Sequence, residues 1–392
     1  MVIRHVGRAA VAVLLFSSLT LKASEISFKR TQIDPKFRSE GTSVGDFNGD
    51  GKLDISAGSV YYAAPDWKMH LVLDEAGEFD PHDYSNSFVN FADDLNGDKR
   101  TDLLVVDFPG KETWWYEQPE SPGGGPWKQH VCTKVSNNES PQYLDIDGDG
   151  QRELLMALAP DQANSDGPDR RMAFLKRPSD PAALWTIRAV SGKGAPYTTR
   201  HAHGLGMGDI NKDGRGDILC PQGWWECPAD AQQAEWSWHA APFGQDCSQM
   251  HVYDFDGDGD NDVLSSSAHG LGMWWHEQKK DDWQTHEISR EFSQTHSNVL
   301  ADINGDGLPD FVTGKRFWAH GPGGDIDPGA PAVVFWFELQ RKDGTVAWIP
   351  HEVDHDSGVG TQFEVADVNS DGLLDIVTSN KKGTHLFEQV RR

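Results

Sequence analysis

The chain has 392 residues, and its 61 Asp and Glu outnumber its 35 Lys and Arg, which makes the net charge -26. Nucleic acids and anionic membranes bind proteins through Lys and Arg, so we expect neither as a partner of so acidic a chain. Four Cys, none of them in a CxxC pair, exclude a disulfide framework and a zinc ribbon.

The first 23 residues have the pattern of an export signal. Arg4 and Arg8 make a positively charged start, residues 9–21 are apolar but too short to span a bilayer, and Ala23 is a small residue suited to cleavage. A buried N-terminal helix is the alternative, but polar sequence follows at once. No other segment is long and apolar enough for a membrane span. We therefore predict a secreted or periplasmic protein in an oxidising, calcium-containing compartment.

The remaining residues, 24–392, contain seven copies of an acidic nonapeptide, D-x-[DN]-x-D-G-x-x-D or a close variant. Oxygen ligands stand at positions 1, 3, 5 and 9 around a Gly that permits positive φ, as calcium loops require. One copy alone is also compatible with an acidic surface turn, whereas seven copies favour up to seven structural Ca²⁺ sites. Lys99 replaces the Gly of the second copy, which we predict to be the weakest site, and Glu153 replaces the last Asp of the third. The predicted calcium ligands are Asp46, Asn48, Asp50 and Asp54; Asp94, Asn96, Asp98 and Asp102; Asp145, Asp147, Asp149 and Glu153; Asp209, Asn211, Asp213 and Asp217; Asp254, Asp256, Asp258 and Asp262; Asp302, Asn304, Asp306 and Asp310; and Asp367, Asn369, Asp371 and Asp375.

Successive loops are 45 to 65 residues apart, a period that suits a four-stranded propeller blade. An apolar strand leads into each loop and a second leaves it. In most periods the third strand is aromatic and ends in Glu, and the fourth carries an aromatic residue three positions before a His or Arg. The last period lacks a fourth strand, which FKRTQI at Phe28 supplies. We therefore predict an all-β fold: a single seven-bladed β-propeller over residues 24–392, closed by its N-terminal strand, with insertions at 161–169 and 321–332.

The histidines fall into two groups. Those of the fourth strands, predicted to make one repeated structural hydrogen bond, are His70, His130, His239, His286 and His351. The others include residues at the starts of first strands, which line the centre of a propeller. The residues six positions before each loop are Glu40, Phe88, Glu139, His203, Ser248, His296 and Thr361. Four of these seven side chains can bind a metal or move protons.

Second strands run back to the face where first strands begin, so they bring further polar side chains to the same mouth. The predicted catalytic residues are His201, His203, His269, His296, Glu139, Lys315, Arg316 and His320. These residue types favour proton abstraction next to a carbonyl or carboxylate, followed by elimination. A divalent metal held by His and Glu, or the pair Lys315 and Arg316, would stabilise the enolate. The alternative is the polar lining of a wet channel without catalysis.

The nonapeptides resemble the FG-GAP/VCBS calcium repeats of integrin-type propellers over essentially the whole mature chain. The stretches HAHGLGMGDINKDGRGDIL, PQGWWECP and VTGKRFWAHGPGG are also similar to the propeller part of aldos-2-ulose dehydratase-like proteins, metal-dependent lyases and isomerases that act on oxidised sugars. That resemblance implies a carbon-oxygen lyase acting on oxidised sugars or uronides, and its catalytic residues cannot be carried over one by one. The competing hypothesis is a non-catalytic propeller that binds a glycan or a protein.

Two smaller expectations complete the sequence analysis. Tyr61, Tyr62 and Phe317 are expected near the mouth, where aromatic rings stack on sugar faces. Cys220 and Cys227 flank the connection of a second and a third strand and are the candidates for a cross-strand disulfide. The oligomeric state is left open.

Overall fold

The computed structural model describes residues 26–121, 125–280, 282–342 and 344–391. The predicted export signal, residues 1–23, lies outside this part of the chain. Within it, regular structure consists of 27 β-strands and one short 3-10 helix, η1 (Gln162–Asn164), so the all-β prediction is confirmed. In these described residues, no helix combines the length and the apolarity needed to cross a lipid bilayer.

Two sheets come first along the described chain. Their strands are β2 (Ser43–Gly45), β3 (Asp54–Ala57), β4 (Val60–Ala63), β5 (Lys68–Leu71), β6 (Val89–Asp93), β7 (Asp102–Val106), β8 (Lys111–Glu117), β9 (Lys128–Leu144), β10 (Glu153–Leu158), β11 (Arg171–Lys176) and β12 (Thr186–Ala189). Strands β2 to β5 pair in chain order, each antiparallel to the next. Strands β6 to β12 form one seven-stranded sheet, because the long β9 pairs with β8 through its first half and with β10 through its second.

Three further sheets contain the rest of the strands. They are β13 (Leu205–Gly208), β14 (Asp217–Cys220), β15 (Gly223–Glu226), β16 (Ser237–Ala240), β17 (Gln249–Tyr253), β18 (Asp262–Ser266), β19 (Leu271–Lys279), β20 (Asp282–Ser293), β21 (Asn298–Ala301), β22 (Asp310–Gly314), β23 (Val334–Lys342), β24 (Thr345–Asp354), β25 (Phe363–Ala366), β26 (Asp375–Asn380), β27 (Gly383–Arg391) and β1 (Ile26–Asp34). A short parallel pairing of β13 with β17 joins two antiparallel sets into an eight-stranded sheet. Strands β21 to β24 form a separate sheet, and β25 to β27 form another with β1.

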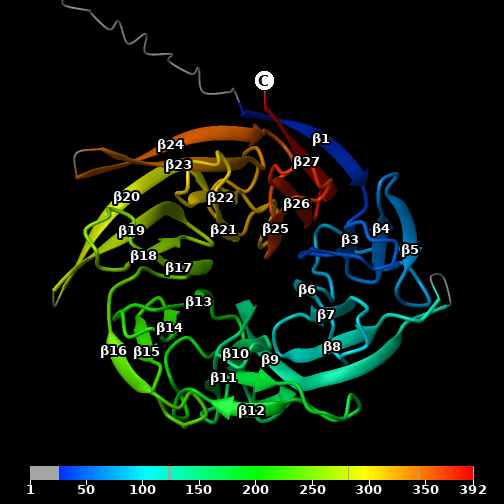
Figure 1. The fold of residues 1–392 in the computed structure, drawn as a ribbon, viewed down its shortest axis with the longest axis horizontal. Helices are drawn as coiled ribbons and strands as arrows, with labels where there is room; N and C mark the ends of the chain where they lie inside the picture. Colours follow the sequence, from blue (N-terminus) through cyan, green and yellow to red (C-terminus); the bar gives the residue numbers. More distant parts are fainter. Residues whose placement is uncertain (1–25, 122–124, 281, 343, 392) are drawn as a thin grey trace, which may run out of the picture.

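The sheets lie around a common centre, with β13, β17, β21 and β25 nearest to it and β12, β16, β20 and β24 at the periphery (Figure 1). Strand β1 pairs antiparallel with β27, and Phe28 lies opposite Gln389. The predicted pairing of the N-terminal strand with the last period is therefore present. We call each set of first to fourth strands around one acidic loop a unit.

The acidic loops fold locally because their carboxylates accept backbone hydrogen bonds. Asp54, the ninth residue of the first loop, accepts one from the N–H of Phe47, at 3.0 Å, and one from Ala64 at the end of β4, at 2.9 Å. The ninth-position Asp of five further loops makes the same pair of bonds. This residue therefore ties six of the seven loops to the third strand of their own unit, whereas Glu153 of the third loop accepts a backbone hydrogen bond from Ile146 alone.

The hydrophobic core lies between neighbouring units. One cluster packs Phe47 and Tyr61 of the first unit against Leu103 and Trp127 of the second, all of them buried. Tyr61 thus belongs to the core, and Tyr62 is buried as well and donates a hydrogen bond to Asp34 at 2.9 Å. The expectation that these two tyrosines stack on a sugar is wrong, because neither ring reaches solvent.

The fourth-strand histidines repeat one structural contact. His130 stacks on Trp115 with 4.0 Å between ring centroids, and its Nε2 lies 2.9 Å from Glu117. The equivalent bonds of three further units join His239 to Glu226, His286 to Glu277 and His351 to Glu338. His70 stacks on Tyr61, but Ala63 stands where the other units have Glu. The predicted hydrogen bond is therefore confirmed in four units, and the first unit lacks its acceptor.

The four cysteines are free and buried. Cys220 lies opposite Gly223 in the pairing of β14 with β15, and Cys227 lies at the other end of this hairpin, beyond Trp225. The candidate disulfide between Cys220 and Cys227 is therefore absent, because the hairpin register holds the two residues apart.

Candidate functional site

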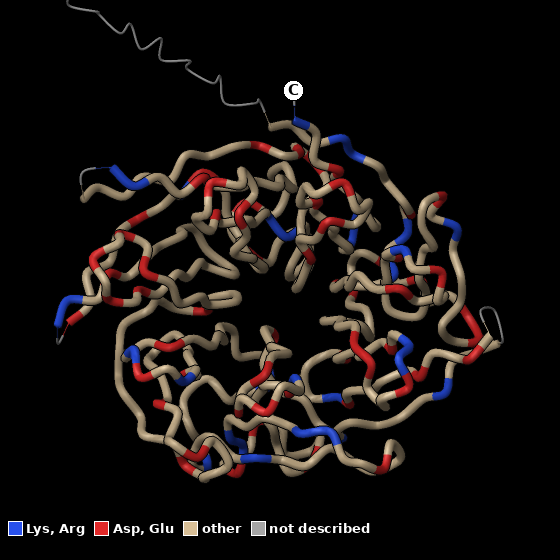
Figure 2. The backbone as a smooth tube through the Cα atoms, in the orientation of Figure 1, with Lys and Arg blue, Asp and Glu red and all other residues tan. Residues whose placement is uncertain are grey.

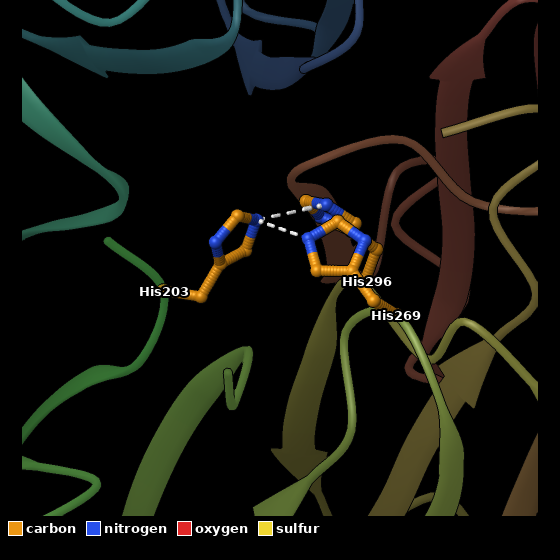
Figure 3. Close-up of side chains that lie close together, drawn as sticks. All are labelled: His203, His269 and His296. Carbon is orange, nitrogen blue, oxygen red and sulfur yellow. Dashed lines mark hydrogen bonds between the residues drawn. The ribbon is translucent and has the colours of Figure 1, made fainter. Parts of the chain in front are cut away.

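Three histidines from different connections meet near the centre of the molecule (Figure 3). His203 precedes β13, His269 lies between β18 and β19, and His296 precedes β21. The Nε2 atom of His203 is 3.1 Å from Nε2 of His296 and 3.1 Å from Nε2 of His269. Each imidazole therefore turns the same nitrogen toward one point. We call these three residues the histidine cluster.

A carboxylate from a fourth element joins the histidine cluster. Glu139 lies in β9, and its backbone N–H donates to the carbonyl of Ala202 at 2.9 Å. Its Oε2 atom is 3.2 Å from Nε2 of His203 and 3.8 Å from Nε2 of His296. Glu139, His203 and His296 are each less than a tenth exposed. The centre thus offers three nitrogen donors and one oxygen donor away from bulk water.

The electrostatics of these groups suit a cation. Burial lowers the pKa of His269 to about 4 and that of His296 well below its usual value, so both rings are neutral. Burial alone would raise the pKa of Glu139 and lower that of His203, but their mutual attraction outweighs it and moves both pKa values the other way. His203 Nδ1 lies 2.8 Å from the carbonyl of His201 and so donates to it, which leaves Nε2 facing the cluster. Neutral imidazoles with a carboxylate are donors that divalent transition metals take.

Arg316 links the histidine cluster to a second buried carboxylate. Its Nη1 lies 2.9 Å from Nε2 of His296, and its Nη2 donates to Oε2 of Glu40. Among the described residues, Oε1 of Glu40 and Nδ1 of His296 are buried without a hydrogen-bond partner. Nη1 of Arg316 also lies 3.9 Å from Oε2 of Glu139, so the two carboxylates Glu40 and Glu139 share one guanidinium.

Two exposed histidines lie at the rim of the histidine cluster. The side chain of His201 is 51% exposed, and its Nδ1 lies 3.4 Å from Oε1 of Glu139. The side chain of His320 is 47% exposed and stacks on His269, and its Nδ1 lies 3.0 Å from Asp325. Each exposed imidazole is therefore oriented by a carboxylate. This is the arrangement of a general acid or base.

Asp325 is a candidate site residue that the sequence reasoning did not find. It lies in the predicted insertion at 321–332, where the repeat has no equivalent position. Besides His320, it approaches Nδ1 of His269 at 3.5 Å. Its only sequence signal is that it follows His320 closely in a Gly-rich stretch.

Lys315 is not brought to the histidine cluster. Its Nζ bonds to Ser293 Oγ at 2.7 Å, and the side chain is fully buried. Successive residues of an extended strand point to opposite sides, so Arg316 faces the centre and Lys315 faces away from it. Burial lowers the pKa of Lys315 to about 8. The eight predicted catalytic residues therefore divide into a group of five at the centre, two rim histidines and Lys315 outside.

A surface pocket lies beside His201. Its volume is about 440 Å³, and its lining includes Tyr197, Gln222 and Asp246 as well as His201. A second pocket of about 670 Å³ shares Tyr197, Gln222 and Asp246. The two pockets therefore form one continuous groove that reaches the exposed face of His201. Volumes of this size are typical of sites for small molecules.

The Asp and Glu residues are distributed all around the molecule (Figure 2). In the first loop, Asp46 accepts backbone hydrogen bonds from Gly49 at 2.7 Å and from Gly51 at 2.9 Å. In the second loop, Lys99 takes the place of Gly51 and adopts a φ of 70°. In the third and fifth loops, three carboxylates approach one another within 4.8 Å: Asp145, Asp147 and Glu153, and Asp254, Asp256 and Asp262.

Solved structures similar to this chain are distant from it. An Agrocybe aegerita lectin that recognises non-reducing terminal N-acetylglucosamine is 14% identical with a TM-score of 0.48, over 84% of this chain and 81% of that chain. A Bacillus licheniformis rhamnogalacturonan lyase is 12% identical with a TM-score of 0.44, over 92% and 71%. The V. cholerae biofilm matrix protein Bap1 is 10% identical with a TM-score of 0.43, over 95% and 89%. Similarities this distant assign no activity to the chain. Any activity must be argued from the residues of the site.

Two segments of the chain match a known family of repeats. No curated protein matches the chain. The FG-GAP-like repeat matches residues 94–156 and 254–313, and each matched segment begins at the first Asp of an acidic loop and continues through the next loop. The chain therefore contains FG-GAP-like repeats in both of these segments.

Proposed function

We propose that this protein is a metal-dependent carbon-oxygen lyase that acts on oxidised sugars or uronides. The observation that carries the proposal is the convergence of His203, His269 and His296 with Glu139 at one buried point. A purely structural core does not need two imidazole nitrogens, those of His269 and His296, within hydrogen-bond distance of a third, that of His203. The exposed pair His201 and His320 adds groups that move protons beside this point.

The scaffold of this site is proposed to be a closed, seven-bladed propeller formed by residues 24–392. Three sheets hold four strands each, β9 divides the seven-stranded sheet into two units, and the parallel pairing divides the eight-stranded sheet into two more. The pairing of β1 with β27 supports closure, because it covers the edge that the last unit would otherwise expose. Calcium bound by the acidic loops would neutralise part of the negative charge and stiffen the rim.

The histidine cluster and Glu139 would hold the divalent ion. The unpartnered Oε1 of Glu40, whose Oε2 binds Arg316, supports a centre whose partner set is incomplete. The ion would supply Lewis-acid polarisation of a substrate carbonyl or carboxylate. Arg316 adds a fixed positive charge 2.9 Å from His296, so that negative charge developing on the substrate oxygen is stabilised.

The two rim histidines would carry the proton transfers. Asp325 holds Nδ1 of His320, which leaves Nε2 as the base, and Glu139 orients His201 in the same way. One of them takes the proton from the carbon next to the carbonyl, a carbon-carbon double bond forms, and the carbon-oxygen bond at the next carbon breaks. The other protonates the departing oxygen. The reaction expels water or an alcohol and involves no change of oxidation state overall.

The groove beside His201 supports a sugar as the substrate class. Its lining combines the ring of Tyr197 with the polar groups of Gln222 and Asp246. An apolar face flanked by hydrogen-bonding groups matches the two kinds of surface that a sugar ring presents.

The test follows the ultraviolet absorbance of a newly formed conjugated enone, with keto-sugars, keto-glycosides and uronides as substrates at constant calcium. We expect a signal in the wild type that falls at least 100-fold in His203→Ala, together with loss of bound transition metal measured by elemental analysis. His239→Ala is the matched control, because His239 contacts Trp224 and Glu226 at the periphery. It should keep both the activity and the metal.

Two outcomes would contradict the proposal. If the folded wild type binds no transition metal, the histidine cluster is not a metal centre. If no substrate reacts while folding and metal content are intact, the protein is a non-catalytic propeller that binds a glycan or protein, and glycan-array binding becomes the measurement to make.

A further inference from the structure

The third unit differs from most others in the charge of one residue beside its acidic loop. This residue lies on the third strand, next to the ninth residue of the loop. In five units it is a glutamate: Glu117, Glu226, Glu277, Glu338 and Glu388. The third unit carries Lys176 instead, at the end of β11, where the neighbouring Leu175 pairs with Leu154 of β10. The charge at this position is therefore reversed in one unit.

The side chain of Lys176 reaches into the third loop. Its Nζ contacts Asp147, lies 2.8 Å from Asp149 and lies 3.4 Å from Glu153. These residues are the third, fifth and ninth of the nonapeptide, which are positions predicted to bind calcium. The ammonium thus takes the place that a cation would occupy. The ammonium donates hydrogen bonds to Asp147 and to Asp149.

The fourth strand of the third unit also carries a different residue type from the fourth strands of other units. Arg188 lies opposite Phe174, where four other units place a His opposite a Trp. The Nε of Arg188 donates to Gln232 at 2.6 Å, and the amide of Gln232 donates to Asp147. Both side-chain donors, Lys176 and Gln232, reach Oδ2 of Asp147, whereas its buried Oδ1 has no hydrogen-bond partner. Both of the positions that elsewhere carry Glu and His carry cations here.

The fifth loop provides the contrast. It holds five Asp in its nonapeptide, four of them at the predicted ligand positions, and Asp256 and Asp258 come within 4.8 Å of Glu277 on the third strand. Glu277 adds negative charge at the position where Lys176 adds positive charge. The nearby Lys279 bonds to Glu277 from the exposed side. In the fifth loop the cation Lys279 contacts Glu277 alone, whereas in the third loop Lys176 contacts three carboxylates of the nonapeptide itself.

We infer that the third acidic loop carries its own cation: the ammonium of Lys176 replaces calcium there, and the loop stays folded without the metal. The inference rests on the proposed calcium binding by the other loops. It sets the number of bound calcium ions below the number of nonapeptides. It also makes the third unit the part of the molecule that resists chelation.

The first experiment measures amide hydrogen exchange of residues 145–153 and 254–262, with calcium and after exhaustive chelation. We expect the fifth loop to lose protection by at least tenfold while the third loop changes by less than twofold. Equal loss of protection in both loops would overturn the inference. In chelator, Lys176→Gln should raise exchange at residues 145–153 at least tenfold, and the matched Lys279→Gln should leave these residues unchanged.

The second experiment counts bound calcium ions by native mass spectrometry. Lys176→Glu should bind one ion more than the wild type, Glu277→Lys one fewer, and Lys176→Arg the same number. If Lys176→Glu gains no ion while Glu277→Lys loses one, the third loop already binds calcium in the wild type and the inference fails. If the wild type binds no calcium at all, the calcium proposal fails, and the effect of Lys176→Gln in chelator decides the role of Lys176 by itself.

Discussion

Burial decides what each histidine of this protein can do. His203 and His296 are buried, so their nitrogens can serve as ligands at a centre closed to bulk water. His201 and His320 are half exposed, so a substrate can reach their rings. The fourth-strand histidines stack on a Trp or Tyr ring and, in four units, form a hydrogen bond with a Glu, as His130 does. The same residue type is thus proposed as a ligand or as an acid or base, and is observed as a packing group, according to its surroundings.

Lys315 offers a pH-dependent test at this scale. Burial lowers its pKa from 10.5 to about 8 in the folded protein, so below pH 8 the fold bears the cost of a buried charge. As the pH rises from about 8 to 10.5, the folded state loses this proton before the unfolded state does, and the wild type gains stability relative to Lys315→Met. We expect a gain of about 1–3 kcal/mol, measured by urea unfolding at both pH values. The rate of enone formation by Lys315→Met should stay within about twofold of the wild type. A larger loss would show that Lys315 takes part in the reaction.

Lys99 offers a second test, which concerns backbone strain. Its φ of 70° lies in the left-handed region, which costs a residue with a Cβ atom about 1 kcal/mol. Lys99→Gly should therefore stabilise the protein by about 1 kcal/mol in chemical unfolding. The matched change is Gly51→Lys, at the same position of the first loop, where φ is 83° and no atom lies within 4 Å of a built Cβ. Gly51→Lys should lower the free energy of unfolding by a similar amount. Changes of the same sign in the two variants would contradict the strain argument.

At the scale of the element, each acidic loop combines two roles. In six loops the ninth carboxylate accepts backbone hydrogen bonds that tie the loop to the third strand, as Asp54 does in the first. Burial raises the pKa of Asp102 in this position to about 7, so desolvation works against its charge in the metal-free fold. A bound cation would offset that cost. Hydrogen bonds therefore stabilise the loops, and we propose that bound calcium stabilises them further.

Chelation tests the proposed calcium. A ligand that binds only the folded state stabilises it by about 4 kcal/mol per site at a thousandfold excess over Kd. Exhaustive chelation should therefore lower the melting temperature by about 10 °C or more in a calorimetric scan, and added calcium should restore it. Magnesium at the same concentration is the control and should restore less, because it prefers a smaller octahedral shell. An unchanged transition after chelation would contradict calcium binding.

At the scale of the whole molecule, the two ends of the described chain stabilise each other. Strand β1 pairs with β27 from Ile26 to Asp34, and Phe28 packs with a cluster that includes Val312, Val334 and Phe387. Without β1, the last sheet would expose an edge with unpaired backbone groups. Stability of the fold thus depends on residues that are most distant in sequence.

Deletion of residues 1–34 tests this dependence. Losing the β1–β27 pairing should lower the melting temperature by at least several degrees and cause association that increases with concentration, measured by light scattering. Deletion of residues 1–25 alone is the matched control and should change neither quantity, because it leaves β1 complete. Equal behaviour of the two truncated chains would show that the pairing contributes little.

The local pattern of this chain was sufficient to predict its strands and loops, because both depend on neighbours in sequence. The alternation of apolar residues indicated the strands, and the loop spacing indicated their grouping. Counting back from each loop also brought Glu139, His203 and His296 to one height, as their Nε2 and Oε2 distances bear out. This worked because repeats place equivalent residues at equivalent positions.

Sequence by itself determined the all-β architecture, the acidic loops and the residues that face the centre, since each of these follows from a short repeated motif. Only the tertiary structure decided that Lys315 turns away, that Asp325 reaches His320, and that Lys176 enters the third loop. The physical reason is that each of these contacts joins side chains outside the repeat pattern. Their positions depend on how an insertion folds, or on which side of a strand meets a neighbouring loop, and no local motif encodes either.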